Sequence, residues 1–362
     1  GIHAIRRRQV WRCPRRSGHD FGEQVVSAAE IVARGGAPDE LAMVRRWWHK
    51  DAPLRLWGLR QVDRFLVAVI WLGHWLPLPL LARVGAAFGT MLYWVARRRR
   101  HVAAVNLALC FPEFRERERQ RLLRAHFRLL GRSLLERGIT WFASADRIRR
   151  LVVLDGWQEN VVPLIAARQP VILVTPHFLG LDLVGTRLTL EGDFVSLYSR
   201  QRRRPVADRW LLHGRTRFGQ QLLLARQDGI RPVVRALKAG RPFYYLPDLD
   251  FGAKESTFVP FFGVPAATVT ALPRLVRLTG AAVVMCVAEM GEAGTGYRAR
   301  FSAPWRDFPS GDEAADVARM NREIEAVVRT IPAQYYWVHR RFKTHPQGKG
   351  FLYRRSDRQP MG

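Results

Sequence analysis

The sequence predicts an α/β fold: a mostly parallel central sheet flanked by helices, with an N-terminal helical membrane anchor before it. Three observations support this prediction. Short apolar runs alternate with helix-like stretches from about residue 151, a long apolar segment lies before residue 98, and ionisable residues follow several of the apolar runs. Alternating strands and helices favour a parallel sheet, because each helix returns the chain to the edge from which the next strand starts.

The chain is strongly basic, with 59 Lys and Arg against 31 Asp and Glu and a formal net charge of +28. A surface of this charge favours an anionic partner: a nucleic acid, an anionic membrane or an acidic protein. The cysteines Cys13, Cys110 and Cys286 are far apart and form no CxxC pair. Their spacing argues against a disulfide framework or a zinc site, and we predict neither a metal nor a cofactor.

Residues 1–45 differ from the rest of the chain. They contain the arginine runs Arg6–Arg8 and Arg15–Arg16 and show no sustained hydrophobic periodicity. We predict a basic extension that is disordered or spurious. A transit peptide or an RNA-binding arm is the alternative.

Residues 46–98 form the predicted anchor. Phe65–Ala82 is an uncharged run of eighteen residues, long enough for a membrane helix, but Pro77 and Pro79 should split it into two shorter helices. Six tryptophans lie in and around the segment, and Arg97–Arg100 ends it, which suits a membrane interface with anionic headgroups. We expect a single-pass or interfacial anchor; an apolar helical pair inside a soluble domain is the alternative.

Residues 99–343 form the predicted α/β domain, followed by a flexible tail, 344–362. Amphipathic helices are expected over 101–150, where apolar residues recur at helical spacing. Strands are predicted at 171–175, 194–198, 221–225, 243–246, 281–288 and 297–301. Helices are predicted near 181–190, 205–218, 231–239, 268–279 and 312–330.

A candidate general base follows the first of these strands. The strand at Val171 should end at Pro176, which has no N–H for the ladder. His177 comes next, and Asp182 lies five residues further on, after Gly180 permits a tight turn. An imidazole whose tautomer is fixed by a carboxylate can act as a general base. We predict that Asp182 orients His177; a histidine that only caps the strand end is the alternative.

Arginines follow the next predicted strand and the helix after it. Arg200 comes directly after the strand, and Arg215 and Arg217 end the helix. Guanidinium groups bind phosphate and can stabilise a developing oxyanion. We predict site roles for Arg200, Arg215 and Arg217, whereas Arg202–Arg204 is more simply a solvated basic turn.

Two carboxylates, Asp248 and Asp250, follow the strand at 243–246. Ligands of open α/β sheets sit at the carboxyl ends of the strands, so these side chains should lie near His177. They could bind a cation or orient Arg215. The apolar stretch Phe258–Thr268, with Phe261 and Phe262, is expected to be a loop that lines a site for an acyl chain; ordinary core beneath a loop is the alternative.

Several of these segments together resemble the late acyltransferases of lipid A biosynthesis, the lauroyl and myristoyl transferases of the glycerolipid acyltransferase superfamily. The resemblance covers roughly Trp47 to Gly348 and leaves residues 1–45 without a counterpart. Many members carry glutamate where this chain has Asp182. The segments that carry the resemblance are Arg99–Glu113, His177–Asp182, Tyr198–Arg200, Gly214–Arg217, Leu246–Gly252, Val259–Phe262 and Gln334–Thr344.

The resemblance implies a bacterial inner-membrane enzyme whose catalytic domain lies on the cytoplasmic face. It would transfer an acyl chain from an acyl carrier protein to a hydroxyl of an anionic, Kdo-bearing lipid A precursor. His177 and Asp182 would form its catalytic dyad, with Arg215 and Asp248 as further essential residues. Alternatives are acylation of another membrane lipid and, from the charge alone, nucleic-acid binding; the latter leaves the apolar run unexplained, so we expect no nucleic-acid partner.

Overall fold

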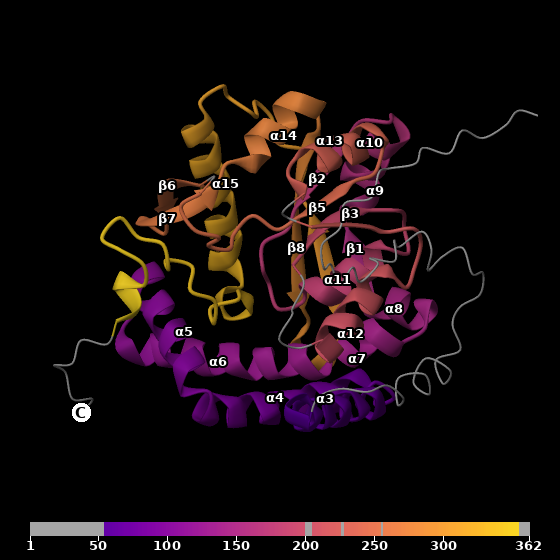
Figure 1. Ribbon diagram of the computed structural model, residues 1–362, viewed down its shortest axis with the longest axis vertical. Coiled ribbons are helices and arrows are strands. Elements are labelled where there is room, and N and C mark those ends of the chain that lie inside the picture. The colour runs from indigo at the N-terminus through magenta and orange to yellow at the C-terminus, as the bar shows by residue number, and fades with distance from the viewer. Residues whose placement is uncertain (1–53, 200–204, 226–227, 255, 355–362) are drawn as a thin grey trace, which may run out of the picture. The chain divides into compact units, whose positions relative to one another are not determined.

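A computed structural model describes residues 54–199, 205–225, 228–254 and 256–354. Its centre is a seven-stranded sheet in the order β1-β9-β8-β2-β5-β3-β4, beside a separate two-stranded hairpin, β6-β7 (Figure 1). All neighbours in the sheet are parallel except β8 and β9. The strands are β1 Val152–Asp155, β2 Val171–Val174, β3 Val195–Tyr198, β4 Leu222–Ala225, β5 Phe243–Tyr245, β6 Ser256–Phe261, β7 Val264–Val269, β8 Ala282–Met290 and β9 Tyr297–Phe301.

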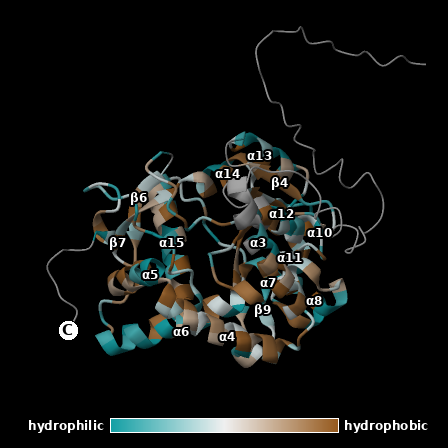
Figure 2. Cartoon of the chain, turned by 60° about the horizontal axis from the view of Figure 1, so that its bottom comes forward, coloured by the Kyte–Doolittle hydropathy of each residue, from teal (hydrophilic) through white to brown (hydrophobic). Residues whose placement is uncertain are grey.

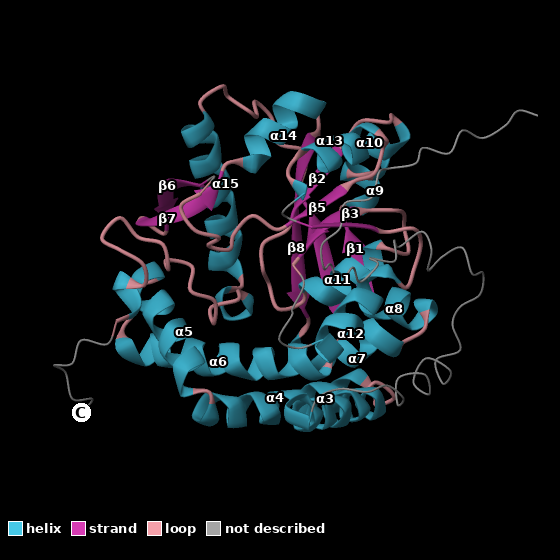
Figure 3. Ribbon diagram, viewed as in Figure 1, coloured by secondary structure: helices cyan, strands magenta, loops and turns pink. Residues whose placement is uncertain are grey.

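Helices cover both faces of this sheet (Figure 3). The α-helices are α3 Leu54–Gly73, α4 Leu78–Val95, α5 Arg97–Cys110, α6 Glu116–Leu135, α7 Arg137–Phe142, α8 Ala145–Leu151, α9 Trp157–Asn160, α10 Val162–Ala166, α11 Leu181–Leu188, α12 Pro205–Thr216, α13 Arg231–Lys238, α14 Ala271–Thr279 and α15 Glu313–Thr330. Short 3-10 turns are η2 Glu292–Gly294, η3 Pro332–Gln334 and η4 Phe351–Tyr353.

The strand order explains which helix lies on which face. The chain moves outward from β2 to β3 to β4 through α11 and α12, then returns to β5 through α13 and reaches β8 through α14. Right-handed crossovers place helices on opposite faces when the direction of travel reverses. Accordingly, α11 contacts α12, and α13 contacts α14.

The same order makes β2 and β5 direct neighbours at the middle of the sheet. Val174 is paired with Tyr245, so the two parallel strands end side by side. β2 is buried along its whole length, as its apolar, β-branched sequence predicts. The residues that follow β2 and β5 therefore meet at one edge of the sheet.

The predicted division of the apolar segment is confirmed: α3 ends at Gly73, and α4 begins after Pro77. One side of α4 packs closely on α6 through glycines. A Cβ on Gly89 would lie 2.1 Å from the Phe127 oxygen, and one on Gly131 would lie 2.3 Å from the Gly85 oxygen. α4 is thus a helix with one side buried in the protein, and its other side is exposed.

All six predicted strands are confirmed within one or two residues, and the predicted helices on the faces of the sheet are confirmed within three. The predicted apolar loop at Phe258–Thr268 is wrong, because these residues form the antiparallel hairpin β6-β7. Its prolines, Pro260 and Pro265, face each other across the hairpin, where no central-strand ladder is interrupted. β1 was not predicted; it is a four-residue strand at the sheet edge with only one fully buried residue.

The start of the predicted tail contacts the rest of the domain. Tyr353 is buried, and its hydroxyl accepts a hydrogen bond from the Phe342 N–H and donates one to Asn106. The turn η4 thus packs on α5. The predicted extension at 1–45, the start of the predicted anchor at 46–53, and residues 355–362 lie outside the described residues.

Candidate active site

His177 and Asp248 form the centre of the candidate site. Nδ1 of His177 lies 2.6 Å from Oδ1 of Asp248, and the backbone N–H of His177 donates to Oδ2 at 2.8 Å. The imidazole is 15% exposed, and the carboxylate is fully buried. With Nδ1–H donating to a carboxylate, Nε2 is left unprotonated and can accept a proton. The pair has the geometry of an oriented general base.

The sheet brings these two residues together. His177 follows β2, and Asp248 follows β5, with a proline before each side chain. The Thr175 N–H continues the ladder by donating to the Tyr245 oxygen, after which both chains leave the sheet. Pairing of neighbouring strands therefore fixes a contact between residues 71 positions apart.

The surroundings keep Asp248 ionised. Burial alone would raise the pKa of this carboxyl, but the charge and hydrogen bonds of His177, together with a hydrogen bond from Tyr335, hold its pKa below the ordinary value. An ionised carboxylate also stabilises the imidazolium that forms when Nε2 takes a proton. The electrostatics thus support the role that the geometry suggests for His177.

Asp182 does not occupy the predicted place beside His177. Its carboxylate lies 3.5 Å from Nη2 of Arg137 and 3.7 Å from Nη2 of Arg215. The predicted partners are exchanged, since Asp248 orients His177 and Asp182 holds Arg215. Asp182 lies in the first turn of α11, and its backbone oxygen accepts a hydrogen bond from Thr186.

The remaining predicted site residues are spread over the fold. Asp250 is buried and accepts hydrogen bonds from Thr344, which places it among the contacts that hold the end of the domain. Arg217 donates to the Ala143 oxygen and lies 4.4 Å above the Phe218 ring. Arg200 lies outside the described residues.

Phe261 and Phe262 belong to an aromatic core. Phe261 is fully buried against Tyr335 and Phe342, and Phe262 packs on Trp337. A different, narrow and mostly apolar pocket begins at Asp182 and Arg215; its other lining residues include Leu181, Leu188, Phe194, Leu211 and Tyr244. Two charged residues of the site, Asp182 and Arg215, thus line this pocket.

The structure adds three residues that the motif analysis did not assign to the site: Arg137, Tyr335 and His339. Arg137 begins α7 and comes to Asp182 from a segment whose charges look like those of an ordinary solvated helix. Tyr335 contacts Asp248, and Nε2 of His339 accepts a hydrogen bond from the Asp250 N–H. Burial lowers the pKa of His339 to about 4, so it is neutral near pH 7.

Burial limits the chemistry of the cysteines in the part of the chain that the structure describes. Cys110 and Cys286 are buried, and burial raises the pKa of the Cys286 thiol to about 12. The described ranges contain no group of three His, Cys, Asp or Glu side chains placed to hold a metal ion. The arrangement suits proton transfer at His177, with a cationic pair, Arg137 and Arg215, on Asp182 of the helix that follows.

Comparison with known proteins gives a consistent result. Residues 54–344 match the family described as bacterial lipid A biosynthesis acyltransferase. The lipid A biosynthesis lauroyltransferase of Escherichia coli K12 is 35% identical over 283 residues, which cover 78% of this chain and 91% of that protein. The palmitoleoyltransferase of the same strain is 34% identical over 290 residues, 80% of this chain and 93% of that protein. A lipid A biosynthesis acyltransferase of Haemophilus influenzae is 34% identical over 281 residues, which cover 76% of this chain and 88% of that protein.

Proposed function

Because the chain belongs to the bacterial lipid A biosynthesis acyltransferase family, and is therefore an acyltransferase, we propose that it acylates a Kdo-bearing lipid A precursor on a hydroxyl. The donor is the thioester of an acyl carrier protein. The observation that carries this proposal is the 2.6 Å contact between His177 and Asp248 at the ends of adjacent strands. It supplies an oriented base, and the arginines that contact Asp182, in the helix after this base, suit an anionic acceptor.

The proposed reaction is direct transfer. Nε2 of His177 takes the proton of the acceptor hydroxyl while its oxygen attacks the thioester carbon. The new C–O bond forms, the C–S bond breaks, and the imidazolium returns the proton to the carrier thiolate. Asp248 holds the imidazole in the reactive tautomer throughout, a role that the sequence motif had suggested for Asp182.

The arginine pair supplies positive charge. Asp182 carries one negative charge between Arg137 and Arg215, so the three side chains together carry a net charge of +1. Such a cluster can bind a phosphate or carboxylate of the acceptor, and Arg215 can stabilise the oxyanion of the tetrahedral intermediate. The role of Asp182 is then to fix the guanidinium groups.

The proposed membrane-binding surface is the outer side of α3 and α4, which lie next to each other along one side of the domain (Figure 1). Hydrophobic residues colour much of α4 when this side is turned forward (Figure 2). Among the helices of the described residues, α4 alone is long and apolar enough to span a membrane, with 18 residues. The exposed apolar side chains are Phe65, Leu66, Val69, Leu72, Trp75, Leu80, Val84, Met91, Trp94 and Val95.

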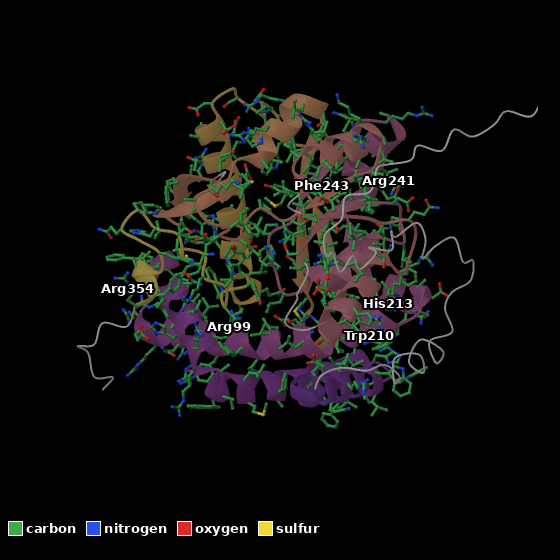
Figure 4. The ribbon with its side chains drawn as sticks, in the orientation of Figure 1. Arg99, Trp210, His213, Arg241, Phe243 and Arg354 are labelled. Atoms are coloured by element: carbon green, nitrogen blue, oxygen red, sulfur yellow. The ribbon has the colours of Figure 1, made fainter. Side chains whose placement is uncertain are left out.

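Packing favours an interfacial helix over a spanning one. The inward side of α4 is buried on α6 by the close glycine contacts, and only its outward side can meet lipid. α3 is also held against the domain. Val67, Ile70 and Trp71 pack on an apolar cluster that includes Trp210 of α12, and Trp210 lies just above α3 (Figure 4). A half-buried apolar helix is typical of a protein that lies on the membrane surface. We place this surface on the cytoplasmic side of the inner membrane.

Basic residues complete the proposed surface for anionic partners. α6 carries the exposed arginines Arg117, Arg121, Arg124 and Arg128 at helical spacing, and α5 begins with Arg97–Arg100. Positive charge beside an apolar surface favours anionic headgroups, and the overall charge of +28 favours an acidic carrier protein.

An acyl-transfer assay tests the proposed function. We expect the purified protein to transfer acyl chains from acyl carrier protein thioesters of graded length to the Kdo-bearing precursor. The His177→Asn protein serves as the matched control, and lysophospholipid serves as a second acceptor. Transfer to lysophospholipid alone would replace the proposed acceptor, and no transfer to the precursor at any chain length would refute the proposal.

Flotation with vesicles that contain anionic phospholipid tests the membrane surface. Val84→Glu with Trp94→Glu is expected to weaken vesicle binding by at least about tenfold, because burial of one large apolar side chain contributes roughly 1.5–3 kcal/mol. Leu278→Glu is the control, since Leu278 is also exposed, at 53%, but lies on α14 away from this surface. Equal binding by the wild type and the double variant would show that α4 does not contact lipid.

A further inference from the structure

A short segment near the end of the domain, Gln334–Trp337, lies directly against the histidine turn. The Leu179 N–H donates to the Gln334 oxygen at 2.8 Å, and the Tyr336 N–H donates to the His177 oxygen at 2.9 Å. Phe178 and Tyr335 form an antiparallel bridge between these two bonds. The backbone of His177 is therefore held from outside the sheet by a segment that is distant in sequence.

The segment is itself fixed at both ends. The Gln334 side chain bonds both backbone groups of Met290, the last residue of β8, at 2.7 and 3.0 Å. Asn106 of α5 donates to the Trp337 oxygen at 2.6 Å, and the Trp337 indole donates to the Pro332 oxygen at 2.7 Å. Four polar side-chain contacts at two ends leave the segment little freedom to move relative to β2.

Tyr335 connects this segment to the carboxylate that orients the base. Its ring is 4% exposed and lies between Phe178, Phe261 and Trp337, with centroid distances of 5.8, 6.0 and 4.8 Å. Its side chain reaches the Asp248 carboxylate, and its hydroxyl is one of the groups that lower the pKa of that carboxyl. In the described part of the chain, the short hydrogen bonds to the Asp248 carboxylate come from the N–H and Nδ1 of His177 itself.

We propose that Tyr335 is a positioning residue for acyl transfer, which holds the Asp248 carboxylate in the orientation that receives Nδ1–H of His177. The inference rests on the proposed function, since it concerns the same base. Two donors from one residue leave the carboxylate free to tilt together with the imidazole. A third donor on a rigid, separately anchored ring fixes the carboxylate relative to the sheet, and with it the direction of Nε2.

The burial of Asp248 makes this donor important. A fully buried carboxylate needs hydrogen bonds to remain charged. The Tyr335 bond helps to lower the pKa of Asp248 against the effect of burial, which would raise it. Loss of the hydroxyl therefore weakens both the orientation and the charge of the group that supports His177.

Tyr335→Phe tests the proposal because it removes the hydroxyl and keeps the ring packing. We expect kcat to fall roughly 10- to 100-fold with KM nearly unchanged, as for loss of a hydrogen bond to a charged group. The deshielded Nδ1–H proton of His177, followed by NMR, should shift or broaden. Tyr336→Phe is the matched control: Tyr336 is the next residue in the same segment, and it contacts His177 through its backbone N–H.

His177→Asn in the same assay separates failure of this inference from failure of the proposed function. If His177→Asn is inactive while Tyr335→Phe keeps wild-type kcat and an unchanged Nδ1–H resonance, the positioning role is refuted and the base assignment stands. If His177→Asn keeps wild-type activity, the proposed function itself fails. Equal losses in Tyr335→Phe and Tyr336→Phe would also refute the role, because they would show a general effect on the segment.

Discussion

Replacement of His177 by asparagine is expected to lower the rate of acyl transfer by roughly 10²- to 10⁴-fold, the usual contribution of a general base. Asparagine is the informative choice because its amide nitrogen can take the place of Nδ1 and still donate to Asp248. Alanine would instead leave a fully buried carboxylate without its side-chain partner, which is costly for folding. The loss of rate in His177→Asn should therefore appear without a large fall in Tm.

The measurement is kcat with the acyl carrier protein thioester and the lipid A precursor, alongside Tm for each variant. His345→Ala is a suitable control, because His345 stacks on Phe351 in the C-terminal segment rather than on the candidate site. Activity within a few fold of wild type for His177→Asn would show that another group takes the proton. A loss of similar size in His345→Ala would instead indicate a nonspecific effect on the domain.

The sequence predicts much of this fold because its signals are local. The run Val171–Val174 is apolar and β-branched throughout, and the structure buries all four residues. Pro77 is a second local signal: it separates α3 from α4, since proline cannot continue a helix that precedes it. The β6-β7 hairpin was missed because Pro260 and Pro265 are unusual in strands and are tolerated only where they interrupt no central ladder.

Asp248 was expected near His177, but which carboxylate contacts the imidazole could not be predicted in the same way. The spacing of His177 and Asp182 is visible in the sequence, whereas the pairing of His177 and Asp248 depends on β2 and β5 being neighbours. The order of strands in a sheet is set by the whole packing, and five residues of local sequence do not contain it. Arg137 and Tyr335 were missed for the same reason, since their contacts with the site depend on packing between elements that are distant in sequence.

Substitution of Asp248 by asparagine should be almost as damaging as loss of the base, with kcat reduced roughly 10²- to 10⁴-fold. The amide keeps the shape of the side chain but not its charge, so the imidazolium formed in the reaction loses its stabilising partner. It also places an NH₂ group opposite N–H groups that now donate hydrogen bonds to the carboxylate.

Asp182→Asn is expected to act differently, with a roughly tenfold rise in KM for the acceptor and a smaller change in kcat, because it loosens Arg137 and Arg215.

A double-mutant cycle distinguishes the two carboxylates more sharply than either single change. If Asp248 acts through His177, adding Asp248→Asn to His177→Asn should cost little more rate, because the two residues work as one unit. Asp182→Asn should remain additive with His177→Asn, since it acts on the arginines. The opposite pattern, with Asp182 coupled to His177 and Asp248 independent of it, would mean that the imidazole exchanges its partner during turnover. The contact between His177 and Asp248 would then belong to the resting enzyme, and the role of Asp182 suggested by the motif would be restored.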